Sequence, residues 1–201
     1  MASAPDSERL VLASASPRRR ELLGLVTLPA AELEILPADI DESERPGEEP
    51  AEYVRRMARS KAEAVARQRP ESWVLAADTI VALGDAVLAK PADAPENAAM
   101  IARLAGRPHQ VTTAVALARG EVREVLAITT EVRFRPLTAS EVEEYAATGE
   151  GLDKAGGYGI QGRGAALVEG ITGSYTNVVG LPLAETLLLL RRWLGAAGEG
   201  A

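Results

Sequence analysis

Residues 10–23, with the sequence LVLASASPRRRELL, combine hydroxyl side chains and cations in a pattern suited to anion binding. A short apolar run leads to Ser14 and to Ser16, a favoured N-cap, and Pro17 stands at the first position of the predicted helix. The N–H groups of a helix N-terminus attract anions, and the run Arg18–Arg20 adds cations with forked donors at the same place. Because these cations oppose the helix dipole, the pattern indicates a bound phosphate. The alternative is a solvated basic turn in an ordinary strand-to-helix connection.

Lysine is scarce in this chain, because the 22 basic residues comprise 19 arginines and 3 lysines. Because the chain otherwise uses arginine, each lysine is a candidate for a position that requires a compact ammonium group. Such a group suits phosphate oxygens. Lys61 falls on the apolar stripe of a helix predicted over residues 51–67, so it either extends to the surface or meets a buried ligand. Lys90 precedes a proline, and Lys154 lies beside glycines. The alternative is chance placement.

Asp78 is the best candidate for a catalytic carboxylate. It directly follows an apolar strand predicted over residues 72–77, and ligands of open α/β sheets bind beyond the carboxyl ends of strands. A carboxylate beside a basic site can hold a divalent cation or activate water. An exposed acidic loop is predicted over residues 31–49. In this loop, Glu42 and its neighbour Asp41 are the candidates for a second acidic ligand. The alternatives are a structural turn residue at position 78 and a solvated acidic loop.

A glycine-rich loop predicted over residues 151–164 supplies further polar groups. Its backbone N–H groups can cradle phosphates beside Lys154, and the amide of Gln161 can read the hydrogen-bonding edge of a base. The run Gly157–Gly162 matches the pattern G-x-G-x-x-G, but it follows no predicted strand and opens no predicted helix, so a dinucleotide site is rejected. The alternative for this loop is a surface connection with a solvated lysine.

The composition excludes several mechanisms. Without cysteine, the chain has no thiol nucleophile, thiolate metal site or disulfide. His109 is the only histidine and no G-x-S-x-G motif accompanies it, which argues against a Ser-His-Asp mechanism. The net charge of −7 argues against binding to a nucleic acid polymer, so an anionic substrate requires a local basic pocket. The sequence shows no signal peptide and no membrane-spanning stretch, and we expect a cytoplasmic protein.

Alternating strands and helices must position these residues. The other predicted elements are a hairpin (80–88), strands (111–118, 122–134 and 165–168) and helices (94–105, 138–147 and 183–194). Their mixture favours an α/β fold, a twisted mixed β-sheet with packed helices that form two lobes around a cleft. We expect a single domain over residues 9–195, with flexible tails over 1–8 and 196–201.

Five segments occur in a recognisable order: SASPRR, ESERPGEEPAEYVRRMARSKA, AADTIVALGDAVLAKP, LDKAGGYGIQG and GSYTNVVGLPL. They resemble the motifs of the Maf family of nucleoside triphosphate pyrophosphatases, historically described as septum-formation inhibitors. The resemblance extends from about residue 10 to about residue 190. It implies a fold similar to that of inosine triphosphate pyrophosphatases, a homodimer, and hydrolysis of a nucleoside triphosphate to the monophosphate and pyrophosphate with a divalent cation, Mg²⁺ or Mn²⁺.

The resemblance also implies roles for individual residues. Asp78 matches the general-base or metal-linked position, and Glu42 resembles the second acidic metal ligand. The positions that hold phosphates are matched by Ser14, Arg18, Lys61, Lys90 and Lys154. Ser16 lies in the first motif, beside Ser14, and we expect it to contact substrate too. The positions that set base preference are matched by Arg19, Thr79 and Gln161. We expect Arg18 and Lys90 to act with Asp78 in catalysis by neutralising charge on the leaving pyrophosphate. Arg20 has no implied role.

The base-preference residues resemble the subfamily that acts on dTTP and UTP. The subfamily that acts on 7-methyl-GTP carries a tryptophan after the proline of the first motif and a glutamate in place of Gln161. We therefore expect hydrolysis of dTTP and UTP, with modified pyrimidine triphosphates as further candidates. Two alternatives stay open. One is a pyrophosphatase for modified purine triphosphates such as 7-methyl-GTP, and the other is a non-catalytic nucleotide-binding regulator of cell division that docks partners through its leucine-rich final helix.

Overall fold

One mixed β-sheet runs through the part of the chain that the computed structural model describes, residues 9–30 and 32–195. The elements of these residues are, in chain order, β1 (Arg9–Leu12), α1 (Pro17–Gly24), β2 (Glu32–Ile35), α2 (Pro50–Ala66), β3 (Trp73–Leu83), β4 (Ala86–Leu88), α3 (Ala94–Leu104), β5 (Pro108–Arg119), β6 (Glu121–Phe134), α4 (Ala139–Ala147), the 3₁₀ turns η1 (Ala155–Gly157) and η2 (Arg163–Leu167), β7 (Val168–Thr172), α5 (Tyr175–Val179) and α6 (Leu183–Leu194). The tails predicted over 1–8 and 196–201 lie outside the described residues.

The strands follow the order β2-β1-β3-β5-β6-β7, with β4 paired to β3. β1 lies parallel to both β2 and β3, and the remaining pairs are antiparallel. Glycines at the two hairpin tips, Gly84 and Gly120, adopt positive φ angles of 60° and 66°, which glycine accepts without steric cost. The mixed sheet predicted from the sequence is therefore confirmed.

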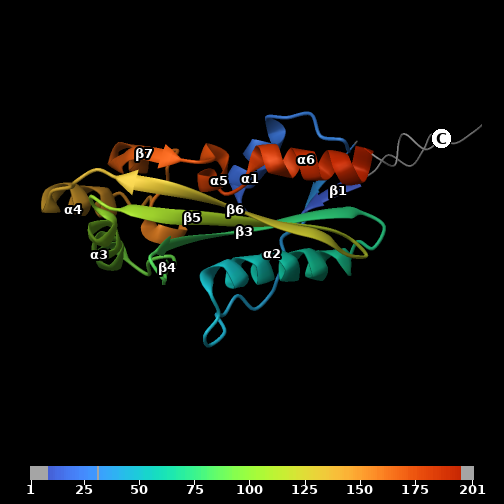
Figure 1. The fold of residues 1–201 in the computed structure, drawn as a ribbon, viewed down its shortest axis with the longest axis horizontal. Coiled ribbons are helices and arrows are strands. Elements are labelled where there is room, and N and C mark those ends of the chain that lie inside the picture. Colours follow the sequence, from blue (N-terminus) through green and yellow to red (C-terminus); the bar gives the residue numbers. More distant parts are fainter. Residues whose placement is uncertain (1–8, 31, 196–201) are drawn as a thin grey trace, which may run out of the picture.

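Helices cover both faces of the sheet at one end of its long strands (Figure 1). Successive residues of a strand point to opposite faces, so Leu10 and Leu12 pack in a core that includes α1 and α6, whereas Val11 packs in a core that includes α2. α2 lies on one side of the sheet in Figure 1, and α1 and α6 lie on the other. This three-layer arrangement buries the strand β1 completely from Leu10 to Leu12.

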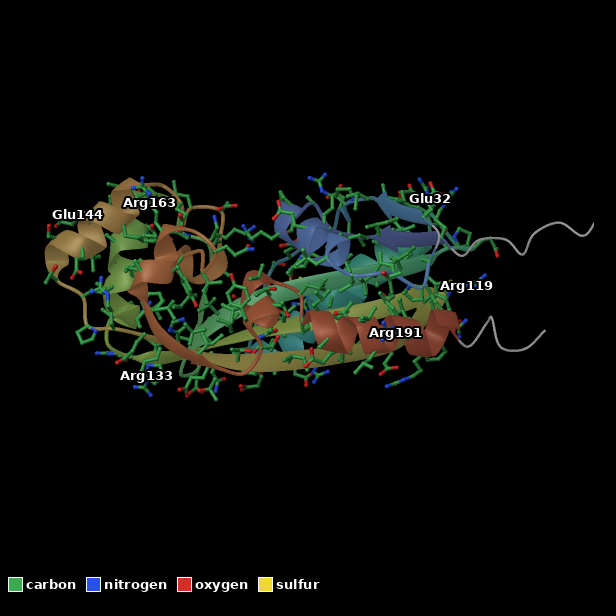
Figure 2. All side chains as sticks on the ribbon, turned by 90° about the horizontal axis from the view of Figure 1, so that it is seen from above. Glu32, Arg119, Arg133, Glu144, Arg163 and Arg191 are labelled. Carbon is green, nitrogen blue, oxygen red and sulfur yellow. The ribbon has the colours of Figure 1, made fainter. Side chains whose placement is uncertain are left out.

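A second group of helices gathers at the other end of the long strands. There α3 and α4 pack with the far ends of β3, β5 and β6 around a third core that includes Ile101, Phe134, Tyr145 and Tyr158. Figures 1 and 2 show α3 and α4 at the end opposite to β1 and α6, with the long strands passing through both groups. The two lobes expected from the sequence correspond to these two groups.

Two strand predictions are wrong in their bounds. The strand expected to end at Ala77 continues as β3 through Asp78 and Thr79 to Leu83, because these residues stay paired with β5; Asp78 lies opposite Ala114. Asp78 therefore projects from the middle of a strand and not from its end. The strand expected over 165–168 begins at Val168, since residues 163–167 form a 3₁₀ turn in which the Ala165 N–H bonds to the Gly162 carbonyl.

The predicted helices are confirmed, the strand expected over 111–118 begins earlier, at Pro108, and β2, α5 and the turn η1 were missed. The predicted helices and the capping box of Thr138 and Glu141 are present. The acidic loop predicted over 31–49 contains β2, which pairs with β1 although half of its residues are glutamates. Among the described residues, no helix has the length and apolar character needed to cross a bilayer.

Candidate active site

One cleft, with a volume of about 990 Å³, gathers the polar residues that the sequence singled out. Its lining comes from α1, from the loop before α2, from β3 and from the glycine-rich loop after α4. Every predicted site residue lines it: Ser14, Ser16, Arg18, Arg19, Glu42, Lys61, Asp78, Thr79, Lys90, Lys154 and Gln161. The hydrophobic stripe of α2 and the pairing of β1 with β3 bring together residues that are far apart in the sequence.

Lys61 joins two carboxylates in this cleft. Its Nζ lies 2.6 Å from Asp78 Oδ1 and 2.8 Å from Glu42 Oε1. The side chains of Lys61 and Asp78 are only 12% and 13% exposed, whereas that of Glu42 is 53% exposed. Lys61 reaches this point because it sits on the inward face of α2, which packs over β3. The structure thus turns Lys61 into the cleft, where it pairs with one shielded carboxylate and one exposed carboxylate of the protein itself.

The two carboxylates fit a divalent cation. Both oxygens that contact Lys61 converge on a single point, and carboxylate oxygens are the ligands that Mg²⁺ and Mn²⁺ prefer. No cluster of three or more acidic or histidine side chains suited to a metal occurs in the part of the chain that the structure describes. A pair of carboxylates suits Mg²⁺ beside phosphates, because proteins usually hold that ion through one or two carboxylates and leave its other positions to water and phosphate oxygens.

Arg19 and Thr79 belong to one hydrogen-bond network in the floor of the cleft. Arg19 donates from Nε to the Gly180 carbonyl (2.8 Å), from Nη1 to Ser14 Oγ (3.1 Å) and from Nη2 to Thr79 Oγ1 (3.1 Å). Burial lowers the pKa of Arg19, and the nearby carboxylate of Asp78 opposes this effect. Most of the donors of Arg19 are thus used within the protein, which makes it a side chain that fixes Thr79 and Ser14.

This network assigns the hydroxyl proton of Thr79. The hydroxyl of Thr113 donates to the Asn177 carbonyl (3.0 Å), because a carbonyl can only accept. The 2.9 Å contact between Thr79 Oγ1 and Thr113 Oγ1 must then use the proton of Thr79. Since Arg19 also donates to Thr79, one lone pair of Thr79 remains, and it can only accept a hydrogen bond from a ligand.

Ser14 has the opposite character. Its Oγ accepts hydrogen bonds from the Ser16 N–H (3.2 Å) and from Arg19, so its own proton is left to donate to a ligand such as phosphate. Ser16 occupies the predicted N-cap position of α1, but its side chain makes no capping hydrogen bond. The N–H groups at the start of α1 are therefore not capped by Ser16, and uncapped N–H groups at a helix start suit an anion.

Asp153 bridges two of the predicted phosphate ligands. It lies 2.5 Å from Lys154 Nζ and 3.7 Å from Arg18 Nη1, and its side chain is 70% exposed. Within residues 9–30 and 32–195, the side chains of Lys90 and Gln161 form no hydrogen bond or ion pair. These two exposed groups line the cleft and are free to contact a ligand.

Sequence reasoning missed the residues that hold the acidic loop. The hydroxyl of Tyr53 on α2 donates to the Glu42 carbonyl (2.8 Å), and Arg56, one helical turn later, donates to the Ser43 carbonyl (3.0 Å) and to Glu48. Burial, and then the charges of Asp78 and Glu42, raise the pKa of Tyr53 to about 12, so its hydroxyl stays a donor. The i, i+3 spacing of Tyr53 and Arg56 is the sequence signal that could have indicated a shared face.

His109 is not part of the site. It is 2% exposed on β5, and its Nε2 lies 2.8 Å from the Tyr158 hydroxyl. Burial lowers the pKa of His109 to about 4. This agrees with the argument from the sequence against a Ser-His-Asp mechanism.

The fold and the cleft define a class of protein. A mixed α/β sheet positions paired carboxylates beside arginines, lysines and a free helix N-terminus, a combination suited to a phosphorylated ligand and a divalent cation. The model of the family described as Maf-like protein matches residues 9–193. The chain therefore belongs to the Maf family.

Relatives of this chain cover almost its whole length. It is 54% identical over 187 residues to a protein of Myxococcus xanthus named dTTP/UTP pyrophosphatase, with 93% of each chain covered. It is 47% identical over 188 residues to a protein of Deinococcus radiodurans with the same name, with 94% of each chain covered. Among solved structures, a nucleoside-triphosphatase / dITP/XTP pyrophosphatase from Mycobacterium abscessus aligns with a TM-score of 0.43 and 17% identity over 63% of this chain and 74% of that one.

Proposed function

We propose that this protein hydrolyses dTTP and UTP to the monophosphate and pyrophosphate, with modified pyrimidine triphosphates as further substrates. The observation that carries the proposal is the single cleft that joins Asp78 and Glu42 to the arginines and lysines. Relatives about half identical to this chain, and matched over nearly its whole length, are named dTTP/UTP pyrophosphatases. Water attacks the α-phosphate, and the protein supplies positioning and charge neutralisation, which dominate catalysis of such reactions.

Asp78 and Glu42 would hold the divalent cation, Mg²⁺ or Mn²⁺. When bound, the cation neutralises phosphate charge and lowers the pKa of water. Asp78 accepts the proton of the attacking water. Lys61 is released from the two carboxylates as the substrate enters and turns to the phosphate oxygens, a contact that its position between Asp78 and Glu42 allows.

The triphosphate is bound by the cations around the cleft. The N–H groups of α1, the hydroxyl protons of Ser14 and Ser16 and the guanidinium of Arg18 bind its oxygens from one wall. Lys154 and Lys90 complete this shell. Arg18 and Lys90 neutralise the charge that develops on the leaving pyrophosphate, which lowers the barrier because no water has to reorganise.

Thr79 and Gln161 read the base, and Arg19 fixes Thr79. Because Thr79 can only accept, it favours a base that presents an N–H, as uracil and thymine do at N3, over a base that presents only an acceptor there. The unengaged amide of Gln161 offers both a donor and an acceptor to the rest of the base edge. A base with the wrong pattern leaves these polar groups unpaired, which discriminates strongly.

We further propose that the protein is a cytoplasmic homodimer that binds neither nucleic acid polymers nor membranes. The net charge of −7 supports the first exclusion, because a polymer of phosphates requires an extended basic surface. Sedimentation velocity of the full chain tests the homodimer, which a purely monomeric species contradicts.

A nucleotide panel tests the proposed activity. Pyrophosphate release from canonical and modified triphosphates with Mg²⁺ or Mn²⁺ should be fastest with dTTP and UTP. A clear preference for 7-methyl-GTP would support the modified-purine alternative. Absence of turnover with every triphosphate would leave the non-catalytic regulator.

The substitution Asp78→Asn tests the catalytic assignment. Without the carboxylate we expect kcat to fall by a factor of about 10³ or more, while a nucleotide still binds through the cations. Asp85→Asn, at the exposed tip of the β3–β4 hairpin, removes the same charge without touching the cleft and serves as the matched control. Loss of activity in both variants, or in neither, contradicts the role of Asp78.

A further inference from the structure

Glu150 organises the glycine-rich loop that carries Lys154 and Gln161. It follows α4 and lies at the wall of the cleft, in contact with the loop from Gly159 to Gly164. No role was predicted for Glu150 from the sequence, and the proposed reaction uses none of its atoms. Its contacts nevertheless reach both the phosphate-binding and the base-reading parts of the site.

Both carboxylate oxygens of Glu150 accept backbone hydrogen bonds from the loop. Oε2 accepts the N–H of Arg163 (2.7 Å), and Oε1 accepts the N–H of Gly164 (3.0 Å) and the hydroxyl of Tyr145 (3.1 Å). The Tyr145 oxygen in turn accepts the N–H of Gly159 (3.2 Å). Gln161 therefore lies in a segment that is held on its N-terminal side through Tyr145 and on its C-terminal side by Glu150.

The loop packs closely against Glu150 at Gly162 and against Lys154 at Gly159. A Cβ at Gly162 would lie 2.3 Å from Glu150 Oε2, and a Cβ at Gly159 would lie 2.9 Å from Cε of Lys154. Such distances are shorter than a van der Waals contact, so a side chain at Gly162 would displace the carboxylate of Glu150, whereas one at Gly159 would displace the flexible end of Lys154. The G-x-G-x-x-G pattern that matched no dinucleotide site thus has a structural reason of its own, because two of its glycines allow the loop to wrap around Glu150 and Lys154.

Glu150 also holds Lys154 through its backbone, since its carbonyl accepts a hydrogen bond from Lys154 Nζ (2.5 Å). Although burial opposes ionisation, the N–H groups of Gly164 and Arg163 hold the pKa of Glu150 below its ordinary value. The residue is therefore an anion under ordinary conditions, bound on one side by loop N–H groups and joined on the other to a phosphate-binding lysine.

We propose that Glu150 is a positioning residue that sets the place of Gln161 relative to Lys154, and so couples base selection to triphosphate binding. This inference rests on the proposed function, because Gln161 and Lys154 contact substrate in that proposal. Glu150 does not touch the reacting atoms. Its loss should therefore weaken binding and base selection far more than the chemical step at Asp78.

The substitution Glu150→Gln tests the inference with little change of shape. Each carboxylate oxygen accepts a backbone N–H, so the amide of the variant must turn its NH₂ group toward one of these donors. Loss of one charge-assisted hydrogen bond corresponds to at least tenfold in the equilibrium that places the loop, and binding weakens as the binding-competent placement becomes less populated. We expect KM for dTTP and UTP to rise about tenfold and the preference over other triphosphates to fall about tenfold, with kcat at saturation within about threefold of the wild type.

Two further variants keep the experiment decisive. Glu143→Gln, on the exposed face of α4, removes the same charge from a side chain that forms no hydrogen bond or ion pair with the described residues, and it should leave KM and selectivity unchanged. Tyr145→Phe removes only the hydroxyl and should show the same shift in selectivity at smaller size, which provides a second test if Glu150→Gln does not fold. Binding of a non-hydrolysable dTTP analogue, measured by calorimetry, should weaken in parallel with the rise in KM.

The outcomes separate this inference from the proposed function. If the wild type hydrolyses dTTP and UTP but Glu150→Gln and Tyr145→Phe keep its KM and selectivity, the positioning role is wrong and the proposed function stands. An equal fall of kcat for every triphosphate with unchanged KM would also overturn it, because that pattern indicates damage to the chemical step. If the wild type shows no preference for dTTP and UTP, the proposed function itself is wrong.

Discussion

Lys61 offers the sharpest test of the charge arrangement in the cleft, because its ammonium contacts the two carboxylates proposed to bind a divalent cation. We consider the substitution Lys61→Met, which keeps a long apolar side chain on the inward face of α2 and removes the charge. In the metal-free variant, Asp78 and Glu42 lose their shared partner. Asp78 loses more favourable electrostatic energy than Glu42, because water can replace the ammonium less well at a side chain that is 13% exposed than at one that is 53% exposed.

The magnitude follows from this burial. Removing one partner of a fully buried ion pair costs about 3–5 kcal/mol. Because water reaches both Asp78 and Glu42, we expect a smaller loss of about 2–3 kcal/mol, in the range of a hydrogen bond to a charged group. For a protein of this size, each kcal/mol shifts Tm by roughly 2–4 °C, so Tm should fall by about 5–10 °C in EDTA.

A divalent cation should reverse much of this loss, since it takes the place of the ammonium. Removal of a positive charge beside the proposed metal position should strengthen metal binding at least tenfold, which is about 1.4 kcal/mol. At saturating Mg²⁺ the variant should therefore gain about 3–6 °C more in Tm than the wild type gains. Thermal unfolding followed by fluorescence, in EDTA and along a Mg²⁺ titration without nucleotide, measures both effects.

Lys90→Met is the matched control, because Lys90 lines the same cleft, is exposed and contacts neither carboxylate. It changes the net charge equally, and its stability should stay within about 0.5 kcal/mol of the wild type. If Mg²⁺ raises Tm of Lys61→Met and of the wild type by the same amount, the ammonium does not occupy the position of a metal ion. That result would refute the reasoning.

Two further predictions follow from groups beside the site. Asp153→Asn removes an anion that pairs with Lys154, one of the proposed phosphate ligands. KM for dTTP should therefore fall about two- to fivefold at low salt, with little change in kcat. A higher KM in steady-state kinetics would mean that Asp153 helps to bind substrate. Burial lowers the pKa of His109 to about 4, so the unfolded chain binds a proton that the native state excludes as the pH falls below 6.5. The free energy of unfolding attributable to His109 should therefore decrease by about 3 kcal/mol between pH 7 and pH 4 and change little below that. Urea denaturation of the wild type and His109→Gln across this range should show the component in the wild type alone, and parallel curves would contradict it.

Local sequence patterns predicted much of the fold. Helical spacing located α2 and placed Lys61 on its inward face, glycines located the hairpin tips, and Thr138 with Glu141 located the start of α4. The bounds of β3 were wrong because Asp78 and Thr79 look like a strand end, yet pairing with β5 keeps them in the sheet. At this position the backbone hydrogen bonds to a neighbouring strand outweigh the low intrinsic preference of aspartate for a strand.

The candidate site was predictable in its residue types and only partly in its roles. Ser14, Asp78 and the scarce lysines were visible because their chemistry stands out locally. Thr113 and Asn177 were not, although they decide which way the hydroxyl of Thr79 points. Their contribution arises from hydrogen bonds between elements distant in the sequence, and no local pattern records such contacts.

The sequence by itself determined which side chains carry charge, where the helices and turns fall, and which family the chain resembles, because these properties depend on residue type and short-range spacing. Only the tertiary structure decided that Lys61 lies between Asp78 and Glu42, that Arg19 bonds to the carbonyl of Gly180, which is 161 residues away, and that the glycine-rich loop closes on Glu150. The physical reason is that each of these contacts requires two remote segments to be fixed by the packing of the helices on the sheet. The residue types that line the cleft can therefore be read from the sequence, whereas their relative positions are determined by long-range packing.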